Sequence, residues 1–231
     1  MPKIVSIVEG EGEVQALPKL LFKILHDLGR YDIQVSQPKN SKGVTNILKP
    51  QGLEYFLRLA AREVDCAAIL VLIDSDGKCP ITLAKQLCQR AMLAQINQPI
   101  MIVCAHHMYE AWLVASIDSI AGQPLGQREG LPATVSFEGD PDQLNNPKLW
   151  IDDRFVNGRG YKESLDQAEM TKLLELELAF AQSRSFQRLY HAVQEALAAI
   201  DTNQIKVTPV YDEPDPSVLP ETRIRKPRNF L

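Results

Sequence analysis

Residues 67–77 read AAILVLIDSDG, and this stretch decides how the rest of the chain is interpreted. A continuous apolar run from Ala67 to Ile73 is typical of a parallel strand that helices cover on both faces, where polar and apolar side chains no longer alternate. The run ends abruptly in Asp74-Ser75-Asp76-Gly77, and Pro80 is placed to begin a helix. The sequence therefore predicts a buried strand that ends in two closely spaced acids.

Short apolar segments of the same kind lie on either side of this strand. The expected strands are 4–8, 32–36, 67–73 and 99–104. The expected helices are 17–28, 53–60, 80–92 and 109–115. Strands that alternate with helices of this length indicate βαβ units, and hence a parallel α/β sheet with helices on both faces.

The pattern changes after this alternating part, so we divide the chain into three regions. Residues 1–118 form the α/β core, residues 119–199 form a loop-rich and helical C-terminal extension, and residues 200–231 form a proline-rich tail. Two helices are expected in the extension, and the second and clearer one spans 186–197, with Ser185 as its expected N-cap. The prolines of the tail exclude a regular helix or a central strand there.

The charge balance limits the classes of partner. Against 25 Lys and Arg the 231 residues carry 29 Asp and Glu, which gives a formal net charge of −4. A protein of this charge does not bind nucleic acid through an overall positive surface, although a local basic site or a metal-bridged phosphate stays open. No apolar stretch reaches the length of a membrane span and no leader segment is evident, so we expect a cytoplasmic protein without membrane contact.

Five acids fall where strands of the predicted sheet end. Glu9 and Glu13 flank the turn after the first strand, Asp74 and Asp76 end the buried strand, and Glu110 follows the next one. The carboxyl ends of parallel strands meet at one edge, where ligands bind. Gathering carboxylates is unfavourable unless a cation compensates, and one or two Mg²⁺ or Mn²⁺ ions would do so. The alternative is that these are unrelated, solvated loop acids.

The residues around these acids resemble a known family. The segments VEGEGE (8–13) and LIDSD (72–76) resemble the TOPRIM domain of topoisomerases, primases and OLD-type nucleases. The segments 8–18, HMYEAW (107–112), GYK (160–162) and 165–197 resemble small bacterial TOPRIM-like proteins with a domain of unknown function. The resemblance spans about residues 3–199, and it implies a TOPRIM or Rossmann-like parallel sheet.

The resemblance also implies a role for each matching residue. Glu9 would be a metal ligand or general base, Asp74 and Asp76 would bind Mg²⁺, and Lys162 would stabilise charge on a phosphate. The implied metal ligands together are Glu9, Glu13, Asp74, Asp76 and Glu110. Relatives often carry a further acid where this chain has Gly77, which leaves open whether two metal ions bind.

Several basic and histidine residues complete the candidate site. We expect Arg154, Arg159 and Lys162 to line the nucleic-acid groove. His106 and His107 adjoin Glu110, and they act either as acid or ligand or simply as polar groups that end a strand.

These residues favour a Mg²⁺-dependent nuclease, or a related phosphoryl-transfer enzyme, that acts on DNA or RNA. Members of the family that the chain resembles are often encoded beside an ATPase, so the resemblance further suggests a bacterial defence effector with an ATPase partner. This chain has no GxxxxGK[ST] motif of its own, and a homo-oligomer is left open. One alternative is a non-catalytic binding or adaptor subunit. A weaker one is a HAD-type phosphatase, with Asp74 as nucleophile and Asp152-Asp153 as later acids.

Overall fold

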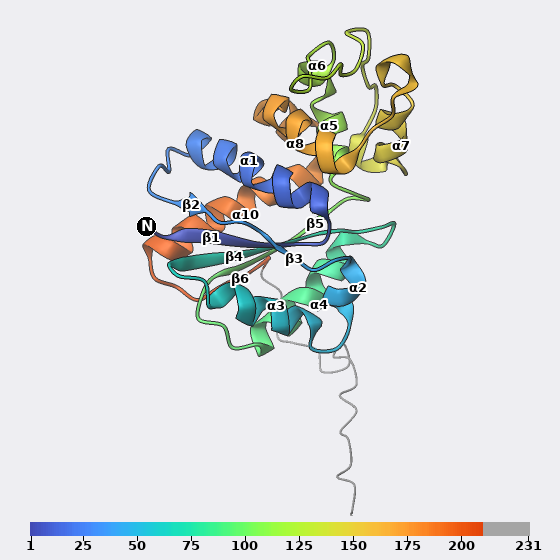
Figure 1. Ribbon diagram of the computed structural model, residues 1–231. Helices are drawn as coiled ribbons and strands as arrows, with labels where there is room; N and C mark the ends of the chain where they lie inside the picture. Colours follow the sequence, from blue (N-terminus) through green and yellow to red (C-terminus); the bar gives the residue numbers. More distant parts are fainter. Residues whose placement is uncertain (210–231) are drawn as a thin grey trace, which may run out of the picture.

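Within residues 1–209, the strands form one sheet in which every strand pairing is parallel (Figure 1). The computed structural model describes residues 1–209, apart from the side chain of Asn157. The strand order is β2-β1-β4-β5-β6, and β3 also pairs with β1. The strands are β1 (Lys3–Val8), β2 (Gln34–Val35), β3 (Lys39–Asn40), β4 (Cys66–Asp74), β5 (Ile100–Ala105) and β6 (Val207–Thr208).

Helices cover both faces of this sheet, so the expected parallel α/β class is confirmed. Figure 1 shows α1 on one face and α3 and α4 on the other, while α5 to α8 gather beyond the carboxyl ends of the strands. The helices are α1 (Glu11–Asp27), α2 (Val44–Leu48), α3 (Gly52–Ala61), α4 (Pro80–Leu93), α5 (Glu110–Ala115), α6 (Ile117–Ile120), α7 (Pro147–Asp152), α8 (Glu163–Leu173), α9 (Leu176–Gln182) and α10 (Arg184–Asp201).

Strand β4 lies at the centre because its residues are apolar on both faces. Leu70 and Leu72 pack into the core beneath α1 and α10, whereas Ile69 and Val71 pack into the core beneath α3 and α4. None of these four side chains is more than 2% exposed. The two cores explain why the alternation of polar and apolar residues is lost in this strand.

Three boundaries differ from the sequence prediction. Helix α1 begins at Glu11 rather than near residue 17, because Glu13 accepts a hydrogen bond from the Gly10 N–H and so caps the first turn. The stretch 38–46, expected as a loop, contains β3 and the start of α2. The strand expected over 32–36 is reduced to the two residues of β2.

The C-terminal region has three consecutive helices, α8 to α10, where the sequence predicted two. The N-cap of α10 is Ser183, whose hydroxyl accepts from the Phe186 N–H at 3.0 Å. Ser185, the expected cap, lies two residues later, within the first turn, and accepts a hydrogen bond from the Trp112 indole at 2.8 Å. Helix α10 then packs along β5, and β6 adds an edge strand in the tail region.

The remaining expectations for the tail lie outside the described residues, since these end at Pro209. The boundary proposed at residue 118 stays a prediction. No helix within residues 1–209 is long and apolar enough to cross a lipid bilayer.

A buried arginine joins α4 to the ends of α2 and α3. Arg90 is only 4% exposed, and its guanidinium donates to the carbonyls of Ile47, Leu48 and Lys49 at 3.1–3.2 Å. It also binds both carboxylate oxygens of Glu54, at 2.9 and 2.7 Å. One side chain therefore satisfies three carbonyl oxygens and one carboxylate on the α3 and α4 face.

We expect Arg90→Met to lower the free energy of unfolding by roughly 3–5 kcal/mol, because it leaves the Glu54 carboxylate without its partner. Denaturant unfolding measures this change. The double variant Arg90→Met/Glu54→Leu should be more stable than the single variant, and Lys85→Met, exposed on the same helix, is the matched control. A single variant as stable as the control would show that the clamp contributes nothing.

Candidate functional site

The carboxyl ends of three neighbouring strands bring the predicted acids to one edge of the sheet. Glu9 directly follows β1, Asp74 is the last residue of β4, and His106 follows β5. These strands are adjacent in the order β1-β4-β5, and all run in the same direction. The topology thus places the acids where open α/β sheets bind ligands.

Glu9 connects the ends of β1 and β4. Its Oε1 accepts a hydrogen bond from the Asp74 N–H at 2.5 Å, and its Oε2 accepts from the Val44 N–H at 3.2 Å. Burial, helped by repulsion from Glu13 and Asp76, raises the pKa of Glu9 to about 7 despite these two donors. The carboxyl group is therefore partly protonated near neutral pH when no cation is bound.

Asp74, the last residue of β4, is half-buried and bonded to the turn after β5. Its Oδ1 accepts from the Tyr109 N–H at 3.0 Å. Burial raises the pKa of Asp74 well above its usual range, and repulsion from Glu110, Glu9 and Glu13 adds to this effect. The carboxylates named by the sequence therefore lie close enough to destabilise one another's charges.

Glu13 and Glu110 form the buried side of the cluster, being 5% and 3% exposed. Burial raises the pKa of both groups, to about 7 for Glu110, and repulsion from Glu163 contributes in each case. The Tyr161 hydroxyl donates to Glu110 Oε1 at 2.9 Å, and the Gln167 amide donates to the same atom at 3.4 Å. Residues at the start of α8 thus complete the site.

Asp76 has a different position, because it is exposed at the outer rim of the edge. Its N–H donates to the His107 carbonyl at 3.1 Å, and it is held with a φ of 46° in the turn after β4. Gly77 follows with a φ of 76°, in the left-handed region that L-residues adopt rarely. This turn geometry favours glycine at position 77.

The two histidines belong to the turn that ends β5. Their rings stack with centroids 4.7 Å apart, and the His107 N–H donates to Ser75 Oγ at 2.9 Å. Burial lowers the pKa of His107. The contact with Ser75 ties the turn after β5 to the turn after β4, which favours a structural role for His107.

Sequence reasoning missed two charged residues of the site, the cation Lys148 and a sixth acid, Glu163. Lys148 forms an ion pair with Glu163, and the attraction of Glu163, Glu110 and Glu13 raises the pKa of Lys148 although burial opposes this. Lys148 follows Pro147 at the start of α7, within a stretch that shows no helical or strand periodicity. Only the short Asn-Pro helix start could have drawn attention to this position.

The cations predicted from the sequence form their hydrogen bonds and ion pairs with residues outside the carboxylate cluster. Arg159 forms a bidentate ion pair with the buried Asp166, at 3.0 and 3.1 Å. Arg154 stacks 4.0 Å from the ring centre of Trp150 and donates to its carbonyl at 2.9 Å. Lys162 is exposed, and its backbone N–H caps α8 through Asp166. Their role in nucleic-acid binding stays a prediction.

The donor set suits a hard divalent cation in its chemistry, because it consists of carboxylate oxygens. Within residues 1–209, however, no group of three or more His, Cys, Asp and Glu side chains is already arranged to hold a metal ion. Glu9, Asp74 and Glu13 each direct an oxygen at a backbone N–H instead. A metal ion would have to share these carboxylates with their amide donors.

The raised pKa of Glu9 predicts a dependence of stability on pH. Folding raises this pKa from 4.5 to about 7 and so favours the protonated form of Glu9. The contribution of this group to the free energy of unfolding is therefore fully present below pH 4.5 and is lost as the pH rises through 7. Relative to Glu9→Gln, metal-free wild-type protein should lose about 1–3 kcal/mol of unfolding free energy across this window. Denaturant unfolding in EDTA measures it, and identical pH profiles for both proteins would contradict it.

The chain is similar to a known family and, distantly, to a solved structure. A structural comparison pairs 87% of this chain with 99% of the C-terminal region of the Burkholderia pseudomallei OLD protein, at 16% sequence identity and a TM-score of 0.39. This similarity is too distant to carry a functional argument. No curated protein matches the sequence. The model of the family described as a domain of unknown function, DUF4276, matches residues 8–194, and the chain therefore belongs to that family.

Proposed function

We propose that this protein is a metal-dependent phosphodiester hydrolase of TOPRIM type that acts on nucleic acid. The observation that carries the proposal is the meeting of Glu9, Asp74, Glu13 and Glu110, which come from separate elements. Glu9, Glu13 and Glu110 all raise the pKa of Asp74, and Glu13 also raises that of Glu9. Such repulsion lowers stability unless protons or a cation relieve it. A divalent cation such as Mg²⁺ or Mn²⁺ relieves it while leaving the carboxylates charged.

The described residues divide the chemistry between them. When bound, one or two metal ions would activate a water molecule and stabilise the leaving oxygen. Glu9 lies between two strand ends and would supply a ligand or accept a proton. Lys148 brings a positive charge to the opposite side of the cluster, where it would stabilise negative charge on a phosphate.

Other parts of the proposal rest on the sequence resemblance alone. They are an ATPase partner, a role in bacterial defence, and an assembly of several copies. The chain itself has no motif for binding the phosphates of ATP, so energy coupling would have to come from the partner.

A non-catalytic binding subunit is the second candidate, and one observation favours it. Residues 1–209 present no ready arrangement of three metal-binding side chains. Calorimetric titration with Mg²⁺ and Mn²⁺ separates the candidates, because an adaptor need bind neither ion. A HAD-type phosphatase has less support, because it leaves the position of Glu9 unexplained, and Asp152 already accepts the Tyr161 N–H at 2.6 Å.

We expect Glu9→Gln and Asp74→Asn each to reduce cleavage of DNA or RNA by about a hundredfold or more, since each removes a charged oxygen at the proposed reaction centre. The assay compares single-turnover cleavage rates in Mg²⁺ and Mn²⁺. Glu177→Gln, at an exposed acid of α9, is the matched control. Wild-type activity no greater than that of the two site variants, with intact folding, would exclude nuclease activity by the isolated protein.

We expect Lys148 rather than Lys162 to be the cation on which cleavage depends. The double variant Lys148→Met/Glu163→Gln removes the ion pair without leaving a buried acid unpaired, and it should slow cleavage about a hundredfold at saturating substrate. Lys162→Met, at an exposed lysine, should change the rate by less than a factor of about ten. The opposite order of effects would restore the role predicted from the sequence.

A further inference from the structure

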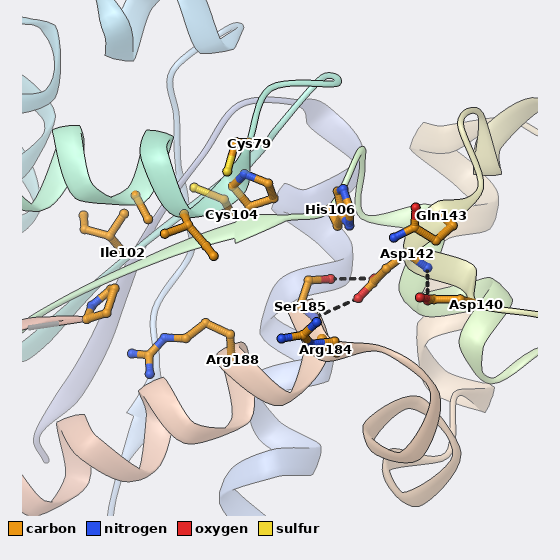
Figure 2. A pocket seen from close by; sticks show the side chains of 14 residues that line it. Cys79, Ile102, Cys104, His106, Asp140, Asp142, Gln143, Arg184, Ser185 and Arg188 are labelled. Carbon is orange, nitrogen blue, oxygen red and sulfur yellow. Dashed lines mark hydrogen bonds between the residues drawn. The ribbon is translucent and has the colours of Figure 1, made fainter.

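A cavity of about 370 Å³ lies beside the candidate site, between α4 and the start of α10 (Figure 2). Its apolar floor consists of Ile81 and Ala84 from α4 and of Ile102 and Cys104 from β5. This size and this mainly apolar lining are typical of pockets that bind small organic molecules.

The rim of the cavity is polar and carries charges of both signs, two arginines and two aspartates. Arg184 and Arg188 extend from α10, and His106 and Gln143 lie towards the carboxyl end of β5 (Figure 2). Both terminal nitrogens of Arg188 bind Glu195, at 3.0 and 3.1 Å. Arg184 is exposed and forms no ion pair within the described part of the chain, so its charge is available to a ligand.

The two acids of the rim are already hydrogen-bonded to the protein. Asp140 accepts from the Asp142 N–H at 2.9 Å, and the buried Asp142 accepts from the Ser183 and Ser185 hydroxyls at 2.8 and 3.0 Å. The Ser185 N–H also donates to Asp142, at 3.0 Å. Asp142 therefore fixes the start of α10, and with it the position of Arg184.

The cavity shares a wall with the carboxylate cluster. Cys79 lines it and belongs to the same turn as Asp74 and Asp76. Cys104 on the floor is close enough to Glu9 and Asp74 for their charges to contribute, after burial and Cys88, to raising its pKa to about 12. A molecule held in the cavity would thus lie next to the proposed reaction centre.

The chemistry of the lining selects one class of ligand. A nucleobase has flat apolar faces that fit the floor and polar edges that Gln143 can bind. A phosphate attached to that base would bind Arg184, since guanidinium groups form paired hydrogen bonds with phosphate oxygens. A purely apolar ligand would leave the arginine unused, and inorganic phosphate would leave the apolar floor empty.

We propose that this cavity binds one nucleotide unit, with the base on the apolar floor and the phosphate at Arg184. The unit comes either from a nucleic-acid strand that continues towards Asp74 or from a free mononucleotide. The inference rests on the proposed function, because it names the part of the substrate that is held beside the carboxylates.

The test is equilibrium binding to the full chain, with Mg²⁺ and separately with EDTA. The probes are adenosine 5′-monophosphate, adenosine, ribose 5-phosphate and a short single-stranded oligonucleotide. Arg184→Ala removes the phosphate contact, and Ala84→Phe fills the floor. We expect each variant to weaken binding of the monophosphate or the oligonucleotide about tenfold or more. Arg62→Ala, at an exposed arginine outside the cavity, should leave binding unchanged.

The probes identify the source of the unit. Binding of the oligonucleotide without the monophosphate supports a strand, and binding of both supports a mononucleotide site that a strand can also use. Adenosine and ribose 5-phosphate should each bind about tenfold more weakly than the monophosphate where that binds. Wild-type protein that binds neither nucleotide probe, or that binds with equal affinity when Arg184 is replaced, overturns the inference.

Cleavage assays keep this result separate from the proposed function. If nucleotide binding does not depend on Arg184 and Ala84, but cleavage depends on Glu9, only the nucleotide cavity is refuted. Cavity-dependent binding without any cleavage refutes the nuclease and leaves the cavity in place. Because Arg184 is exposed, its replacement tests the inference even where Ala84→Phe does not fold.

Discussion

Repulsion between buried carboxylates is the constraint on which the rest of the site depends. The Asp74 N–H binds Glu9 Oε1 at 2.5 Å, so the end of β4 holds the acid that follows β1. This bond is available only because β1 and β4 are parallel neighbours that end at the same level. The fold thereby forces together charges that would separate in a flexible chain.

Helix α8 and the residues near it provide hydrogen-bond donors and a positive charge to these acids. Gly12 permits the contact between α1 and α8, because a Cβ there would lie 2.3 Å from Gln167 Oε1 and 2.6 Å from Glu163 Cγ. Helix α8 can therefore pack closely on α1 and bring Tyr161 and Gln167 to Glu110. The same approach places the Lys148–Glu163 pair beside the cluster. The helices beyond the core are thus part of the site.

The sequence predicts the centre of the fold well, because burial on both faces of β4 leaves a direct trace in residues 67–73. The parallel direction of the strands, and hence the placement of Glu9 and Asp74 at one edge of the sheet, followed from the alternation of helices and strands. The strand order that makes β1 and β4 neighbours did not. Both predictions rest on local patterns that a single sequence displays.

Features made by contacts between distant residues were not predicted. Lys148 joins the site through Glu163, fifteen residues later, and neither residue lies in an amphipathic segment that would orient it. The sequence favours Ser185 as the N-cap of α10, but Ser183 is also a serine at a suitable spacing, and the sequence alone does not distinguish the two. Their distinction depends on Asp142 and Trp112, which only the tertiary structure brings near.

The formal net charge of −4 has to be interpreted together with the positions of the charges. An acidic edge without cations repels a phosphate, whereas Arg184, on a neighbouring rim that carries charges of both signs, would bind one. On the proposed function, the two regions act together: the arginine holds a nucleotide near the edge, and metal ions reverse the sign of the field at the carboxylates. Overall acidity is then compatible with a nucleic-acid ligand, because attraction is confined to the place where the reaction would occur.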